Sequence, residues 1–164
     1  MIYYLSLGSN IGDKTANLQK TIGFLEGIGD ILKVSSIYET EPVGMDTTEE
    51  VENFYNLVLS IDTTLSPVPL LKEIKEFEKH MGRDIAHSHN LPRVIDIDIL
   101  LAGDRIVNTR DLVIPHKEMT KRAFVLIPLN EIAPEVIHPV LKKPVKEILA
   151  NLHSTVIVKK VSTM

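Results

Sequence analysis

The sequence predicts an α+β fold, in which a mainly antiparallel sheet packs on one face against helices. Two observations predict it: segments with the alternating pattern of strands are interleaved with segments of helical spacing, and their order is strand, helix, strand, strand, helix, strand. That order is typical of a ferredoxin-like sandwich, to which an extra C-terminal helix and strand are added. The chain has 164 residues, no internal repeat and no linker-like stretch, so we expect a single domain over residues 1–164.

The first half of the chain supplies four of these elements. Residues 2–7 alternate as a strand. Apolar residues then repeat at helical spacing over residues 13–26, and glycines end that helix. Residues 31–38 and 54–62 are again typical of strands, and a long, acidic loop separates them.

The second helix has a clear start and stop. Ser66 is a suitable N-cap and Pro67 suits the first helical position, while apolar residues repeat at helical spacing as far as Met81, before Gly82. After an irregular stretch, residues 94–101 form an apolar strand, and a turn leads into a short return strand near residues 106–107.

The C-terminal third is expected to be broken into short pieces by four prolines, because proline interrupts helices and strands. These pieces are a short helix that carries Arg122 and Phe124, a helix over residues 145–152 and a last strand over residues 155–161. The prolines are Pro128, Pro134, Pro139 and Pro144.

The strand at residues 94–101 contains the most informative pair of side chains. Alternate strand residues share a face, so Ile95, Ile97 and Ile99 are expected in the core, with Asp96 and Asp98 together on the opposite face. Two neighbouring carboxylates repel each other, and a hard cation such as Mg²⁺ bound with substrate phosphates would relieve this. An amphipathic strand with aspartates on its wet face remains the alternative.

Two further groups could complete a site. Phe54 and Asn56 share one strand face and suit a flat heterocycle, although an edge aromatic beside a capping Asn is also common. His116 and Arg122 flank the start of a short helix, which suits a phosphate, with a capped turn and a surface arginine as the alternative. Glu78, on the outer side of the second helix, is expected to be solvated.

Composition excludes several classes of protein. A net charge of −4 argues against nucleic acid as the main partner, and no apolar stretch approaches the length of a membrane span. Cysteine is absent, which excludes thiolate catalysis and fits a cytoplasmic location, and the N-terminus lacks the features of a secretory signal.

A series of short motifs follows the chain in this order: Leu7-Gly8-Ser9-Asn10, Ser35 to Gly44, Phe54-Tyr55-Asn56, Glu78, Gly82-Arg83, Pro92-Arg93, Asp96 to Leu100, Pro115-His116, Arg122, Phe124, Pro128-Leu129 and Ile132-Ala133-Pro134. Taken together, these motifs resemble those of the 6-hydroxymethyl-7,8-dihydropterin pyrophosphokinase family. The resemblance implies ATP as a substrate, and because no P-loop and no protein-kinase signature set is present, ATP must be bound in another way.

The resemblance implies Mg²⁺-dependent transfer of diphosphate from ATP to the hydroxymethyl group of the reduced pterin, with release of AMP. It implies two Mg²⁺ ions held by Asp96 and Asp98, and catalytic roles for Arg93, Asp96, Asp98 and Arg122. It implies ATP contacts by Glu78, Arg93, Ile99, His116, Lys117 and Arg122. It implies a pterin pocket formed by Thr40, Pro42, Val43, Phe54, Asn56, Asp96 and Phe124. We expect a monomer whose partners are these small molecules.

The loop before Pro92 departs from the family pattern. Ile85 stands where many relatives have arginine, and Asn90 stands where some have tryptophan. Two other functions remain open. Ferredoxin-like domains also serve as ligand-binding regulatory modules without catalysis, and the aspartate pair alone would permit a metal-dependent phosphotransferase or hydrolase that acts on another nucleotide.

Overall fold

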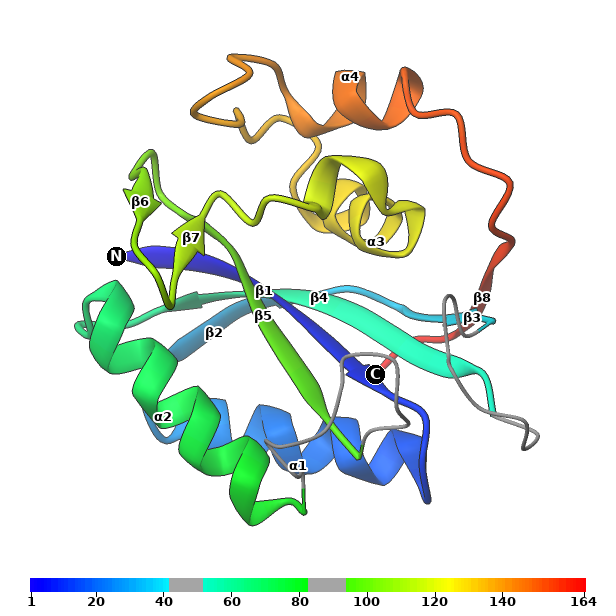
Figure 1. Ribbon diagram of the computed structural model, residues 1–164. Coiled ribbons are helices and arrows are strands. Elements are labelled where there is room, and N and C mark those ends of the chain that lie inside the picture. The colour runs from blue at the N-terminus through cyan, green and yellow to red at the C-terminus, as the bar shows by residue number, and fades with distance from the viewer. Residues whose placement is uncertain (42–51, 83–93) are drawn as a thin grey trace.

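A computed structural model describes residues 1–41, 52–82 and 94–164 (Figure 1). Its centre is an antiparallel sheet with the strand order β5-β1-β4-β3-β8, in which β2 also pairs with β4. The strands of this sheet are β1 (Ile2–Ser9), β2 (Asp30–Val34), β3 (Ile37–Thr40), β4 (Phe54–Asp62), β5 (Asp96–Ala102) and β8 (Val158–Ser162). The helices are α1 (Lys14–Glu26), α2 (Pro67–His80), α3 (Ala123–Ile132) and α4 (Val145–Ala150), with a 3-10 turn at Met119–Lys121.

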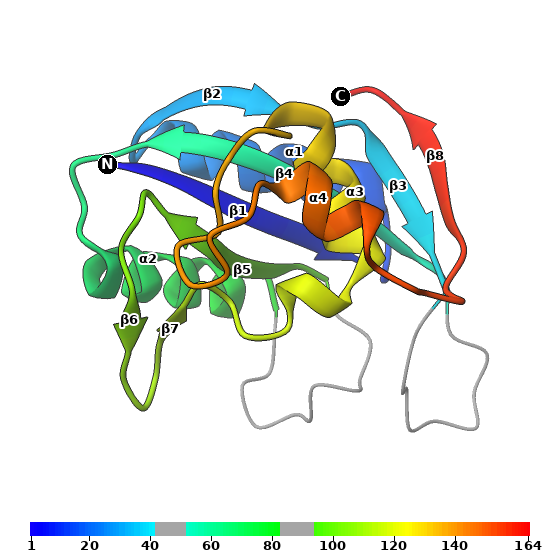
Figure 2. The same ribbon diagram turned by 90° about the horizontal axis from the view of Figure 1, so that it is seen from above.

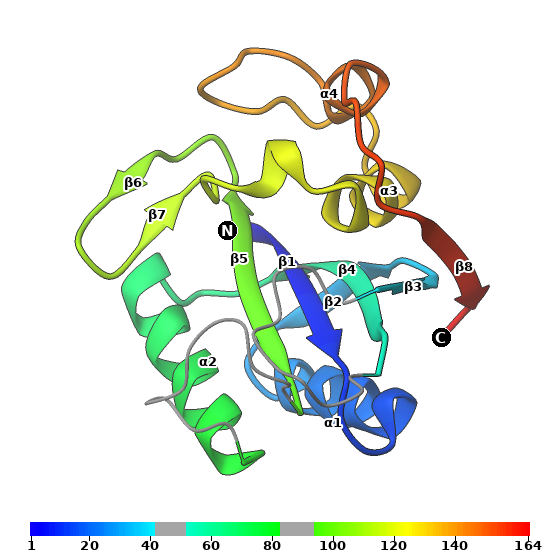
Figure 3. The same cartoon turned by 45° about the vertical axis from the view of Figure 1, so that its right-hand side comes forward.

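The helices cover both faces of the sheet. Figures 1 and 3 show α1 and α2 on one face, and α3 and α4 on the other. The first pair was expected from the ferredoxin-like order of elements, but the expectation that helices cover one face alone is wrong. The C-terminal third of the chain supplies the second layer.

Two hydrophobic clusters share the central strands. Leu5 and Leu57 belong to the cluster beneath α1 and α2, whereas Val58 and Leu101 belong to the cluster beneath α3. Successive strand residues point to opposite faces, so one short strand can fill both clusters. All four side chains are fully buried. The sheet is therefore fixed in place from both sides.

The predicted helix starts agree with the structure. The Asp13 side chain accepts a hydrogen bond from the backbone N–H of Ala16 at 3.0 Å, as expected at an N-cap. Ser66 occupies the N-cap position of α2 and Pro67 its first turn, although within the described residues the Ser66 side chain makes no capping hydrogen bond.

The strand expected over residues 31–38 is interrupted in the structure. It forms β2 and β3. Of the two serines between them, Ser35 still donates its N–H to the Val58 carbonyl in β4 at 2.9 Å, but the regular pairing stops there. The Ser35 hydroxyl accepts a hydrogen bond from the N–H of Val58 at 2.9 Å, and the Ser36 N–H donates to the carboxylate of Glu131 at 3.0 Å. The Ser35 hydroxyl thus replaces a backbone carbonyl as the partner of the Val58 N–H, and the Ser36 N–H is bonded to α3 rather than to a strand.

Two expectations for the C-terminal half are wrong. Pro128 does not end the helix, since α3 continues to Ile132 with Leu126 and Leu129 buried against the sheet. Burial of that apolar face outweighs the missing hydrogen bond of proline. The short return strand is β6 (Val107–Asn108), which pairs with β7 (Val113–Ile114) in a separate hairpin rather than with β5.

The remaining C-terminal elements are close to those expected. α4 begins at Val145, and β8 pairs antiparallel with β3, extending the sheet at that edge (Figure 2). In the described parts of the chain, no helix has both the length and the apolar character to cross a membrane.

Candidate active site

A row of paired residues crosses β5, β1 and β4 near one end of these strands. Gly8 of β1 pairs with Asp96 of β5 on one side and with Asn56 of β4 on the other. Residues paired across antiparallel strands project to the same face, so the Asp96 carboxylate and the Asn56 amide lie on either side of a glycine. The next row brings Ser6 opposite Asp98.

Gly8 keeps the middle of the row free of side chains. A Cβ at this position would lie 3.0 Å from the Asn56 Oδ1 and 3.6 Å from the Phe54 Cδ1. The first distance is shorter than ordinary van der Waals contact, so a larger residue would push Asn56 aside. Glycine therefore maintains a flat floor between the carboxylate and the amide.

The amide side of the floor is tightly held. The Asn56 Nδ2 donates to the Thr40 Oγ1 at 2.9 Å, and both side chains are buried. This bond fixes the orientation of the amide, which can then recognise one edge of a planar ligand. Phe54 lies on the same strand face, two residues before Asn56, and is half-buried.

The carboxylate side is electrostatically unfavourable without a cation. Burial, and then the charge of Asp96, raise the pKa of Asp98 from 3.8 to about 7, although the side chain is 33% exposed. Arg122 opposes this increase. Two carboxylates so close together are suitable oxygen donors for Mg²⁺. The positive charge of the metal would favour the ionised form of both carboxylates. The residues present therefore fit the metal that the sequence predicts.

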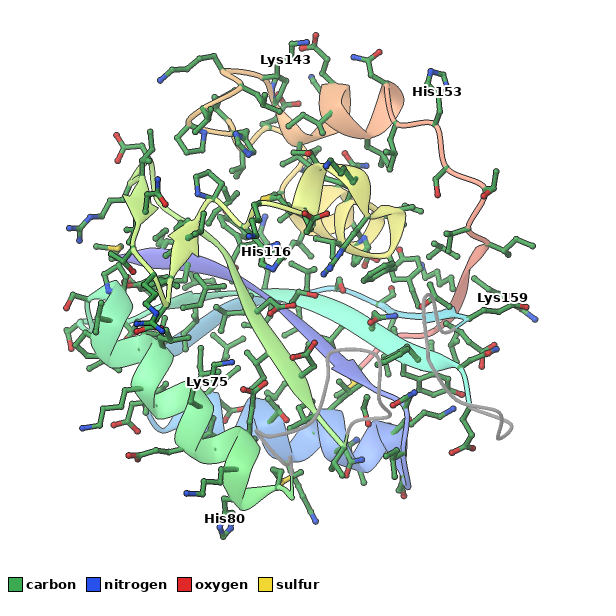
Figure 4. All side chains as sticks on the ribbon, in the orientation of Figure 1. Lys75, His80, His116, Lys143, His153 and Lys159 are labelled. Atoms are coloured by element: carbon green, nitrogen blue, oxygen red, sulfur yellow. The ribbon has the colours of Figure 1, made fainter. Side chains whose placement is uncertain are left out.

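His116 lies beside this pair. Its Nε2 is 3.9 Å from the Asp98 Oδ1, and its Nδ1 accepts a hydrogen bond from the N–H of Glu118 at 3.1 Å. Burial, and then Arg122, lower the pKa of His116, which favours the neutral ring. Because Nδ1 is an acceptor, the proton of the neutral ring lies on Nε2, facing Asp98. Figure 4 shows His116 next to β5 on the α3 side of the sheet.

The position of His116 is set by a backbone contact. Its N–H donates to the carbonyl of Leu100 in β5 at 3.0 Å, so the segment before α3 is attached to the strand that carries the aspartates. Arg122 follows at the start of α3, with its guanidinium carbon 5.7 Å from the ring centroid of Phe124. The structure thus brings the basic groups to the aspartate strand from the α3 side.

Glu78 is placed differently from the expectation. It was expected to be solvated, but its side chain is 1% exposed and its Oε2 accepts a hydrogen bond from the N–H of Ile97 at 2.8 Å. It reaches β5 from α2, on the face opposite to His116. Sequence spacing carried the signal, because Glu78 continues the buried stripe of Leu70 and Ile74 at intervals of four residues.

Three other predicted residues are also located. Ile99 is buried in the cluster beneath α1 and α2, so any contact with a ligand above the floor would be made by its backbone. Lys117 is exposed, and Phe124 is half-buried. Pro42, Val43 and Arg93, together with the unusual Ile85 and Asn90, lie outside the described residues.

Comparison with known proteins identifies the family. Residues 4–134 match the model of 7,8-dihydro-6-hydroxymethylpterin-pyrophosphokinase. A 2-amino-4-hydroxy-6-hydroxymethyldihydropteridine pyrophosphokinase from Aquifex aeolicus is 45% identical over 88% of this chain and 88% of its own length. The protein of that name from Bacillus subtilis is 40% identical over 82% of this chain and 80% of its own.

Longer relatives contain the same unit. The folic acid synthesis protein FOL1 of Dictyostelium discoideum is 43% identical over 92% of this chain, which corresponds to 22% of the relative. The crystal structure of Plasmodium falciparum HPPK-DHPS with pteroate matches with a TM-score of 0.72 and 20% identity, over 91% of this chain and 42% of that one. This likeness confirms the α+β fold. With its fold, its motifs and most of its length matched, the chain belongs to the 7,8-dihydro-6-hydroxymethylpterin-pyrophosphokinase family.

Proposed function

We propose that this protein transfers the terminal diphosphate of ATP to the hydroxymethyl group of 6-hydroxymethyl-7,8-dihydropterin, with Mg²⁺ held at Asp96 and Asp98. Membership of the family makes it a pyrophosphokinase of folate biosynthesis. The observation that carries the detailed proposal is the row Asp96, Gly8, Asn56, in which a carboxylate and an oriented amide flank an open floor. A pterin on this floor would have its polar edge at Asn56 and its hydroxymethyl group toward Asp96.

The aspartates would hold the metal, and two ions are expected from the family resemblance. Bound Mg²⁺ would screen the phosphate charges and polarise the transferring group. The contribution of the chain is a carboxylate pair that is only partly ionised near pH 7, because the pKa of Asp98 is raised to about 7, and a bound cation would favour its full charge. Asp96, nearer the floor, would also orient the hydroxymethyl group.

The nucleotide would lie on the side of His116 and Arg122. The neutral His116 presents its Nε2–H beside Asp98, which suits donation to a phosphate oxygen, while Arg122 supplies a permanent charge. We assign Lys117, at the exposed rim, and Arg93 to the same phosphates. These groups would stabilise the charge that develops on the transferring diphosphate.

The pterin pocket would be completed by two aromatic rings. Phe54 and Phe124 would contact the two faces of the bicycle, Thr40 would keep Asn56 oriented, and Pro42 with Val43 would close the pocket. We further propose that residues 1–164 act as one domain and as a monomer in the cytoplasm. The shared strands of the two hydrophobic clusters support a single domain.

The experiment that tests this function is AMP formation from ATP and the pterin, with and without Mg²⁺ and with controls that lack the pterin. AMP that appears only when metal and pterin are both present supports the proposal. ADP, or AMP without pterin, would indicate a different phosphotransferase or a hydrolase. Pterin binding without turnover would indicate a binding module.

A substitution separates these outcomes further. Phe54→Ala is expected to weaken pterin binding while nucleotide binding is unchanged, because the ring lies on the amide side of the floor. A nucleotide hydrolase would be indifferent to the change.

A further inference from the structure

The backbone between Asp96 and Asp98 is held by a hydrogen bond to α2, the helix on the face of the sheet opposite to His116. β5 lies at the end of the strand order and pairs with β1 on one side. Ile97, which separates Asp96 from Asp98, donates its N–H to the Glu78 Oε2 at 2.8 Å. This bond joins α2 to β5 at Ile97, the residue between the two aspartates.

A carboxylate is a costly acceptor for this purpose. The Glu78 side chain is 1% exposed, and an ionised group removed from water loses hydration that its partners must replace. Lys75 Nζ lies 3.5 Å from Glu78 Oε1, but the lysine side chain is 53% exposed. Glu78 also adds a third negative charge near the pair, since its charge helps to raise the pKa of Asp98. Water or a neutral side chain could satisfy an edge amide without these penalties.

We infer that Glu78 is a positioning residue, which holds β5 through the Ile97 N–H so that Asp96 and Asp98 keep the spacing that binds Mg²⁺ with ATP. This inference rests on the proposed function. Glu78 belongs to α2, whereas His116 lies on the α3 side of β5 (Figure 4), so Glu78 acts on Asp96 and Asp98 through the strand. Without this bond the backbone at Ile97 could move, and the spacing of the two carboxylates on either side of it would change.

Three variants separate the hydrogen bond from the charge. Glu78→Gln keeps an acceptor at the same reach without the charge. Glu78→Asp keeps the charge but is one methylene shorter and cannot reach Ile97 without movement of the backbone. Glu76→Ala, at an exposed position of the same helix, is the matched control.

The primary measurement is the calorimetric dissociation constant of a non-hydrolysable ATP analogue, with Mg²⁺ and in EDTA. We expect Glu78→Asp to weaken Mg²⁺-dependent binding by about tenfold or more, as supporting residues around metal ligands typically do. Glu78→Gln and Glu76→Ala should stay within about threefold of the parent protein. Binding in EDTA should be the same for all four proteins, and thermal unfolding should show that each is folded.

The opposite pattern would overturn the inference. Normal binding by Glu78→Asp with weak binding by Glu78→Gln would mean that the charge matters and the hydrogen bond does not. Equal losses with and without metal would indicate a purely structural role. If the parent protein bound the analogue equally well in Mg²⁺ and in EDTA, the proposed function itself would fail, and that result is visible before any variant is compared.

Discussion

Replacing Asp98 by asparagine should make the metal-free protein more stable at neutral pH while abolishing turnover. The pKa of Asp98 is about 7 in the folded protein against 3.8 ordinarily, mainly because of burial and the charge of Asp96. A carboxyl group with a raised pKa binds more protons when folded than when unfolded, so the stability of the protein falls as pH rises. This loss begins near pH 4 and is complete a little above pH 7. Asparagine at the same position has no such dependence.

The size of the effect follows from the same interval. A full proton difference changes the unfolding free energy by about 1.4 kcal/mol per pH unit, so the interval from 3.8 to about 7 sets an upper limit of about 4 kcal/mol. The side chain is 33% exposed, and water screens the repulsion. We therefore expect Asp98→Asn to gain about 1–2 kcal/mol over the parent protein at pH 8, and little or nothing at pH 4.

Urea unfolding in EDTA at pH 4, 5, 6, 7 and 8 measures this difference. Comparing the two proteins at each pH cancels the other titrating groups, and Asp104→Asn, at an exposed position, is the control that should show no trend. Mg²⁺ with an ATP analogue should stabilise the parent protein but not Asp98→Asn. The reasoning fails if Asp98→Asn is less stable than the parent at pH 8, or if the difference between them does not vary with pH.

Three other predictions concern the floor and the sheet. Gly8→Ala should raise the KM for pterin about tenfold, without changing the affinity for Mg²⁺ and an ATP analogue. An unchanged KM would mean that the pterin does not lie over Gly8. Tyr38→Phe removes a 2.6 Å hydrogen bond to the Glu131 carboxylate and should cost about 1.5–3 kcal/mol in urea unfolding; a cost below about 0.5 kcal/mol would count against it. Gly29→Ala should lower the unfolding free energy by about 1–3 kcal/mol, because the new Cβ would lie 2.7 Å from a backbone oxygen. Its control is Gly23→Ala, where the Cβ meets nothing within 4 Å and should stabilise α1 by up to about 1 kcal/mol.

Features with a short repeat could be predicted from the sequence alone. The alternation of isoleucine and aspartate places Asp96 and Asp98 on one face of their strand, and the structure confirms it with Ile97 and Ile99 in the core. The bounds of β4 were likewise predicted, because strand period and helix period are properties of neighbouring residues. The same reasoning puts Asn56 on one strand face but does not say which other strand it meets.

Contacts between distant segments were decided by the tertiary structure. The break between β2 and β3 depends on Glu131, and the helical conformation of Pro128 depends on the sheet beneath α3. Glu78 continues the buried stripe of α2, but its hydrogen bond to the Ile97 N–H depends on the packing of α2 against β5. Such outcomes depend on which chain segments become neighbours, and no local pattern carries that information.

The candidate site depends both on local sequence patterns and on contacts between distant segments of the chain. The sequence by itself determined which residue types share a strand face and, through the order of its motifs, which family the chain resembles. The register of β1 against β4 and β5 decided that Asp96 and Asn56 would lie on either side of Gly8. That register results from the burial of two hydrophobic clusters at once, since a shift of one strand by one residue would turn its side chains to the opposite faces of the sheet.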